Sequence, residues 1–180
     1  MRDTNRQYDQ VIESARDIFL KKAKDYGTAW RVLRSISIAD QIFIKAQRIR
    51  TIQEKGEQRV SDDIGGEFKG IINYALIGMI QLELDREAPE ELPLDLVSSL
   101  YNKHAAIAKH VMQDKNHDYG EAWRSMSQES FVDLILMKLQ RIRQILANDG
   151  KTLISEGIDA NYTDILNYAA FALILMSEKK

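Results

Sequence analysis

Two octets of the sequence are nearly identical: KDYGTAWR at residues 24–31 and HDYGEAWR at residues 117–124. At the same offset of 93 residues, the pattern DxIxxKxQRIRxI begins at Asp40 and again at Asp133. After one inserted residue, the NYA triplet that begins at Asn73 matches the triplet that begins at Asn167. Self-similarity of this extent at a fixed offset identifies a tandem duplication.

Each copy opens with a pattern typical of an amphipathic helix. In the first copy Tyr8, Ile12 and Ala15 follow the spacing of four and seven residues that lines one helix face. Gly27 and Gly120 then supply the residue type that most easily adopts the left-handed backbone at a helix end. The first helix of each repeat is therefore expected to stop at the DYG turn.

Two further helices are expected in each copy. The second is predicted at 28–54 and 121–147, and the third at 61–84 and 155–178. Both are apolar on nearly every side in the second copy, which predicts helices surrounded by protein. With no credible strand pattern, the fold class is all-α: a helical bundle of two tandem three-helix repeats packed as a pseudo-dimer.

The duplication divides the chain into two repeats, residues 1–84 and 94–180, joined by a segment at 85–93. This segment is acidic and holds both prolines of the chain, Pro89 and Pro93. Proline interrupts helices because it lacks an N–H donor and clashes with the preceding turn. We expect an irregular linker here.

The composition is that of an ordinary globular protein: 44% of the 180 residues are hydrophobic, 29% are charged and the net charge is −2. This balance argues against duplex DNA as a partner. The chain has no cysteine, so a metal would need oxygen or imidazole ligands. The sequence shows no signal-peptide pattern and no apolar stretch long enough to cross a bilayer, so we expect a cytoplasmic protein without a membrane partner.

Three charged residues, Asp133, Lys138 and Arg141, interrupt the apolar second helix of the second repeat, and the first repeat keeps the same residue types. Burying a charge is costly unless it is paired or binds something. One interpretation is a salt-bridge network within or between the repeats. The other is an anion pocket in which Lys138 and Arg141 bind phosphate while Asp133 orients the arginine.

The third helix of the second repeat places Asn161, Asp164 and Asn167 on one face, because residues three apart are neighbours on a helix. Two more acids lie near its start. Oxygen ligands that face basic residues suit Mg²⁺, which neutralises phosphate charge. The candidate magnesium ligands are Glu156, Asp159, Asp164 and Asp133.

The first repeat lacks two of these acids, since Gly65 and Gly70 stand where the second repeat has Asp159 and Asp164. We therefore expect the second repeat to hold the fuller site and the first to hold a partly degenerate one.

The DYGxAWR turn gathers rings and charges within a few residues. In the second repeat Tyr119, Trp123 and Arg124 could stack on a nucleotide base. The alternative is that the rings are core anchors after a helix end. The candidate substrate-binding residues of the second repeat are Lys138, Arg141, Tyr119, Trp123, Arg124 and Asn167.

The pattern KxxDYGxAWR, followed by DxxxxKxxRI and DxxNYA, resembles the family called nucleotide modification associated domain 1. The resemblance covers nearly the whole sequence as two copies, of which the second is fuller. It implies an all-α domain associated with the synthesis or modification of nucleotides.

A second resemblance is to the MazG-type all-α nucleoside triphosphate pyrophosphatases, whose magnesium sites use an ExxE helix followed by an ExxD helix. Glu156 and Asp159 form an ExxD pair, whereas the upstream element, Glu129 and Asp133, reads ExxxD. This resemblance implies a magnesium-dependent hydrolase of nucleoside triphosphates.

Two functions of different classes follow from these observations. The first is a nucleotide-binding helical protein of nucleotide metabolism or base modification, with magnesium-dependent pyrophosphohydrolase activity as its catalytic form. The alternative is a non-catalytic helical module for protein interaction, whose charges specify how the repeats pack. The exposed faces of an unequal pseudo-dimer also favour a homodimer.

Overall fold

The computed structural model describes residues 3–57, 63–85, 87–153 and 155–179. This part of the chain contains six α-helices and two short 3₁₀ helices but no strand, which confirms the all-α prediction. None of its helices is both long enough and apolar enough to cross a membrane. The elements are α1 (Thr4–Tyr26), η1 (Ala29–Val32), α2 (Ser35–Lys55), α3 (Ile64–Glu83), α4 (Leu94–Tyr119), η2 (Ala122–Ser125), α5 (Gln128–Ala147) and α6 (Ile158–Glu178).

The second helix of each repeat begins later than the sequence predicted. The expected helices at 28–54 and 121–147 each divide into a 3₁₀ turn and an α-helix. Arg34 (φ −73°, ψ 160°) and Ser127 (φ −74°, ψ 149°) have extended backbone, which separates the turn from the helix that follows. The stops at Gly27 and Gly120 are confirmed, since both residues have positive φ.

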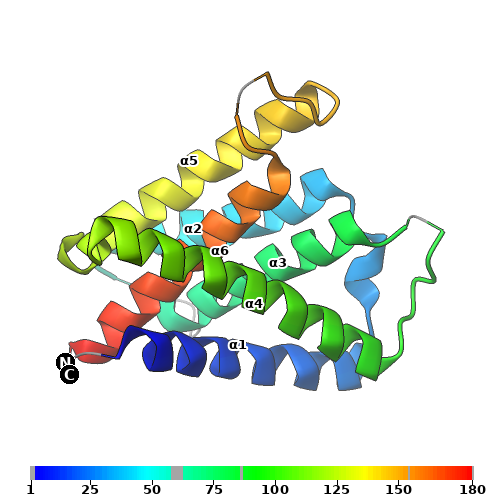
Figure 1. Cartoon of the computed structure of the whole chain (residues 1–180), viewed down its shortest axis with the longest axis horizontal. Coiled ribbons are helices and arrows are strands. Elements are labelled where there is room, and N and C mark those ends of the chain that lie inside the picture. Colours follow the sequence, from blue (N-terminus) through cyan, green and yellow to red (C-terminus); the bar gives the residue numbers. More distant parts are fainter. Residues whose placement is uncertain (1–2, 58–62, 86, 154, 180) are drawn as a thin grey trace.

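The central helices α3 and α6 pack along each other, and the remaining helices surround them (Figure 1). Most of their residues are buried, as expected. A Cβ added at Gly78 of α3 would lie 2.7 Å from the ring of Tyr162 on α6, so glycine permits the close approach. Helix α5, in contrast, buries only one face, so the expectation that it is surrounded by protein is wrong.

Two buried hydrogen bonds join the repeats in the same way. The Tyr8 hydroxyl of α1 donates to Asn167 Oδ1 at 2.7 Å. The Tyr101 hydroxyl of α4 donates to Asn73 Oδ1 at 2.8 Å. Each asparagine also donates its amide to a backbone carbonyl in the first helix of its own repeat. This reciprocal exchange is what a pseudo-dimer with related halves requires.

We predict that Tyr8→Phe and Tyr101→Phe each lower the free energy of unfolding by about 1–3 kcal/mol, because each leaves a buried asparagine oxygen without its donor. Urea denaturation measures both values. Tyr119→Phe is the control, since Tyr119 is exposed, and its midpoint is expected to stay unchanged. Equal midpoints for all three variants would show that the two bonds do not hold the repeats together.

Candidate functional site

The DYGxAWR turn of the second repeat directs its tryptophan into the core. The Trp123 ring stacks on Phe171 of α6, with centroids 4.1 Å apart and planes 6° apart. Its Nε1 donates to Asn116 Oδ1 at 3.0 Å, and only 7% of the residue is exposed. This geometry is that of a core anchor. Tyr119 lies at the surface instead, with 73% exposed.

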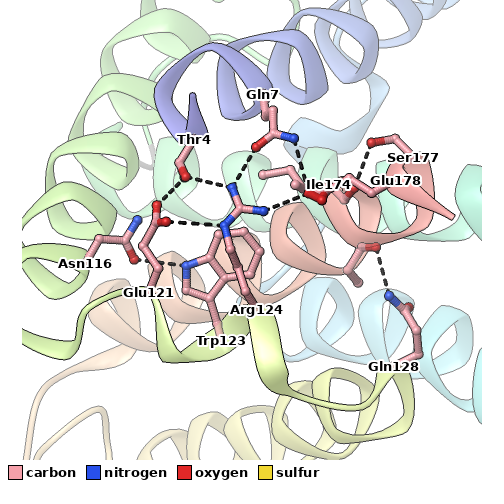
Figure 2. A network of polar contacts seen from close by, with 11 residues as sticks. Thr4, Gln7, Asn116, Glu121, Trp123, Arg124, Gln128, Ile174, Ser177 and Glu178 are labelled. Atoms are coloured by element: carbon pink, nitrogen blue, oxygen red, sulfur yellow. Dashed lines mark hydrogen bonds and ion pairs between the residues drawn. The ribbon is translucent and has the colours of Figure 1, made fainter. Parts of the chain in front are cut away.

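Arg124 is the centre of a polar network between the two ends of the chain (Figure 2). Its Nη1 donates to Glu178 Oε1 of α6 at 2.7 Å. Its Nη2 donates to Thr4 Oγ1 and Gln7 Oε1 of α1, each at 2.7 Å. Nε donates to Glu121 Oε2 at 3.3 Å. Arg124 therefore fastens the start of α1 to the end of α6.

Arg31, the equivalent arginine of the first repeat, holds the connection between α3 and α4. Its Nη2 donates to the carbonyls of Asp85 and Ala88 at 3.3 and 3.0 Å. Its Nε donates to the carbonyl of Pro89 at 3.2 Å. The motif arginines thus occupy matching junctions, and both use their guanidinium groups within the protein.

A carboxylate shared by two lysines lies beside the second repeat's turn. Asp164 Oδ2 lies 2.8 Å from Lys138 Nζ, and Oδ1 accepts from Lys115 Nζ at 2.9 Å. Asp164 and Lys138 are buried, so each charge has its counter-charge adjacent. Burial lowers the pKa of Lys115, but the hydrogen bond and charge of Asp164 outweigh it and raise that pKa above its usual value.

Of the remaining candidate residues of the second repeat, two share a cleft and the others lie apart. Arg141 and Glu156 are exposed and, with Lys138, line an open cleft of about 880 Å³ beside the α5–α6 loop. Asp159 is exposed on the first turn of α6. Asn167 is buried and holds the reciprocal bond to the first repeat.

Asp133 faces the other repeat across the contact between α2 and α5. Its Oδ1 lies 4.0 Å from Nε of Arg50, and the matching Arg143 donates from Nη2 to Asp40 Oδ1 at 3.0 Å. The sequence predicted salt bridges within or between the repeats from Asp133, Lys138 and Arg141, but here the partner of Asp133 is Arg50 and the pair lies at the surface. Both pairs are solvent-exposed, so each contributes at most about 1 kcal/mol.

The four acids do not form the expected magnesium site. Asp133 points toward the other repeat, and Asp164 gives its two oxygens to two lysines. Within the described ranges, no group of three or more histidine, aspartate or glutamate side chains is placed to hold a metal ion. No three of these four acids are therefore gathered around one point, and magnesium binding stays a prediction.

The first repeat contains a cavity of about 520 Å³ between the end of α1, the turn that follows it, and α3. Four aromatic rings, three lysines and two acidic side chains line it. The lining residues that matter here are Tyr26, Trp30, Tyr74, Lys22 and Lys45.

Smaller side chains are the reason this volume is open in the first repeat. Where the second repeat has Asn116, Asp164 and Phe171, the first has alanine, glycine and isoleucine. Phe171 and Asn116 hold the Trp123 ring, and Asp164 fills the space between the lysines. In the sequence, Gly70 indicated a degenerate site, but in the structure it contributes to a cavity. Comparing the side-chain volumes of the two copies could have revealed this from the sequence.

The charges inside this cavity are loosely paired. Lys45 Nζ lies 3.8 Å from Glu67 Oε2 and 5.9 Å from the centroid of the Tyr74 ring. Glu67 Oε1 lies 3.2 Å from Arg48 Nη1, so the arginine offsets the glutamate charge. Burial, and to a smaller extent the neighbouring Tyr26, raises the pKa of Tyr74 above its usual value, so this phenol is neutral at pH 7. The cavity therefore combines uncharged rings with three lysines and with the carboxylates of Asp63 and Glu67.

The fold and this geometry define a class: an all-helical tandem-repeat protein with one copy opened by small side chains. The family model described as "Nucleotide modification associated domain 1" matches residues 22–82 and 115–176. The chain belongs to this family and carries its domain twice. No curated protein and no solved structure matches the chain.

We predict that Asp164→Asn lowers the free energy of unfolding by about 3 kcal/mol, because it leaves the buried ammonium of Lys138 without its counter-charge. The matched control is Asp133→Asn at the surface, expected to cost less than about 1 kcal/mol. Chemical denaturation compares the two. Similar costs for both variants would contradict a buried, structural role for Asp164.

Proposed function

We propose that this chain binds a nucleoside phosphate in the cavity of the first repeat. The observation that carries the proposal is that Trp30, Lys22 and Lys45 line one volume of about 520 Å³. Pockets for small ligands have volumes of about 300–1,000 Å³ and combine apolar walls with a few polar groups. The family description supports a nucleotide-related role.

Each part of a nucleoside phosphate has a matching group in the cavity. The rings of Tyr26, Trp30 and Tyr74 can stack on a base, an interaction of about 1–3 kcal/mol per base. The ammonium groups of Lys22 and Lys45 can bind phosphate oxygens through charge-assisted hydrogen bonds. Both kinds of contact are needed to recognise a nucleotide rather than a free base or free phosphate.

The proposal places the ligand in the first repeat, although the sequence favoured the second. In the second repeat Trp123, Arg124 and Asn167 hold the fold together, and the charge of Lys138 is already balanced by Asp164. Those groups already use their hydrogen bonds, charges or ring faces within the protein, so few of them are available to a ligand. In the first repeat, Trp30 is partly exposed and Lys45 is loosely paired, so both are more available to a ligand.

Binding is proposed because the cavity of the first repeat supplies rings for a base and ammonium groups for a phosphate. Magnesium-dependent pyrophosphohydrolase activity stays a prediction of the MazG-type resemblance, and release of pyrophosphate from each triphosphate tests it directly. The open volume in the first repeat favours a ligand-binding protein over the protein-interaction module, because a module that only packs its repeats does not need a cavity of ligand size. A homodimer also stays a prediction.

The two tryptophans of the chain provide the test, because they occupy matching positions with different surroundings. In Trp123→Phe, Trp30 is the single tryptophan, and we expect a saturable fluorescence change with ribo- or deoxyribonucleoside mono- or triphosphates, with and without magnesium. Trp30→Phe is the matched control, in which Trp123 is expected not to respond. Trp30→Ala is expected to weaken binding about tenfold through lost stacking.

Two results would contradict the proposal. One is the absence of any response from Trp30 at millimolar nucleotide, together with no increase in melting temperature of the wild-type chain, since a ligand that binds only the folded state must stabilise it. The other is an equal response from Trp123, which would place the ligand in the second repeat.

A further inference from the structure

The two repeats place their lysines in matching positions around a residue that differs. Lys22 and Lys45 of the first repeat correspond to Lys115 and Lys138 of the second. In the second repeat the carboxylate of Asp164 bridges the lysines at 2.9 and 2.8 Å. In the second repeat, therefore, the chain itself supplies the oxyanion that the two ammonium groups bind.

The first repeat has Gly70 at this position. A Cβ placed on Gly70 would lie 2.9 Å from Cε and 3.2 Å from Nζ of Lys45, so the lysine passes directly over the glycine. Lys22 and Gly70 line the same cavity as Lys45. The cationic surroundings of the oxyanion are therefore kept, while the residue that supplies it in the second repeat is absent.

We propose that a phosphoryl group of the ligand occupies the place beside Gly70, between Lys22 and Lys45, that the Asp164 carboxylate occupies in the second repeat. The inference rests on the proposed function and names the phosphate subsite of its cavity. In the second repeat this place is already filled by the carboxylate of Asp164, so we expect one chain to bind one ligand.

The charge balance of the first repeat supports an anion at this place. Arg48 already accompanies Glu67, at 3.2 Å, and the closest approach of Lys45 to that carboxylate is 3.8 Å. In the second repeat Lys138 lies 2.8 Å from its partner. A phosphoryl group presents several oxygens to both lysines, as one carboxylate does in the second repeat. Lys69 and Asp63 also line the cavity, so three lysines face two carboxylates, one of which, Asp63, caps the start of α3.

The test gives the first repeat the residue of the second. Gly70→Asp is expected to lower affinity for the nucleoside phosphate at least about tenfold, because its carboxylate competes for both lysines. The fold should tolerate it, since the nearest atoms belong to the flexible end of Lys45 and glycine is a poor helix former. Gly70→Asn, of equal size without charge, is expected to lose clearly less affinity. Circular dichroism and melting temperature verify that both variants are folded.

A second pair of variants tests the lysines without altering Gly70. Lys22→Met is expected to weaken binding about tenfold. Lys21→Met is the neighbouring control, because Lys21 is exposed and pairs with Asp17 at 2.9 Å. Three results would each overturn the inference. Gly70→Asp could leave the affinity unchanged, it could lose as much affinity as Gly70→Asn, or the two lysine variants could have equal effects.

Inorganic pyrophosphate separates this inference from the proposed function. If the fluorescence of Trp30 responds to nucleotides and Gly70→Asp does not lower their affinity, nucleotide binding is supported and the proposed phosphate subsite is wrong. If no nucleotide binds but pyrophosphate raises the melting temperature of the wild-type chain and not of Gly70→Asp, the subsite stands and the nucleotide is wrong. If pyrophosphate stabilises neither protein and no nucleotide binds, both are overturned.

Discussion

The packing of α3 against α6, together with the reciprocal hydrogen bonds from α1 to α6 and from α4 to α3, determines the rest of the structure. Each central helix buries an asparagine that must satisfy both its oxygen and its amide. The oxygen is satisfied by a tyrosine of the other repeat, through Tyr8–Asn167 and Tyr101–Asn73. Neither repeat can complete its own buried polar groups, so the two halves must fold against each other. The arginines of the DYGxAWR turns then fix the two junctions between the halves.

The duplication lets one scaffold carry two different interiors. The second repeat fills the space beneath its turn with a stacked tryptophan and a carboxylate between two lysines. The first keeps the lysines and aromatic residues but has smaller side chains at three positions, which leaves a cavity. Because the second copy and the interface supply rigid packing, the first copy can hold a less completely filled volume.

Much of the fold could be predicted from the sequence, whereas little of the candidate site could. The repeated octets fixed the tandem organisation, and the apolar runs fixed α3 and α6 as central helices. The start of α2 was misplaced because helix patterns do not detect a short 3₁₀ turn followed by extended backbone at Arg34. The number of acids led the sequence analysis to place the site in the second repeat. A sequence pattern records which charged groups are present but not whether they neutralise one another, as Asp164 and Lys138 do.

By itself, the sequence determined the all-α class, the two copies, the helix stops at Gly27 and Gly120, and membership of a nucleotide-related family. These depend on local periodicity, on backbone preferences of single residues and on similarity along the chain. Only the tertiary structure decided which copy is open and which charges are already paired. A cavity is the volume that side chains from several helices fail to fill, and an ion pair depends on distances between residues far apart in sequence. Neither quantity is present in the order of residues alone.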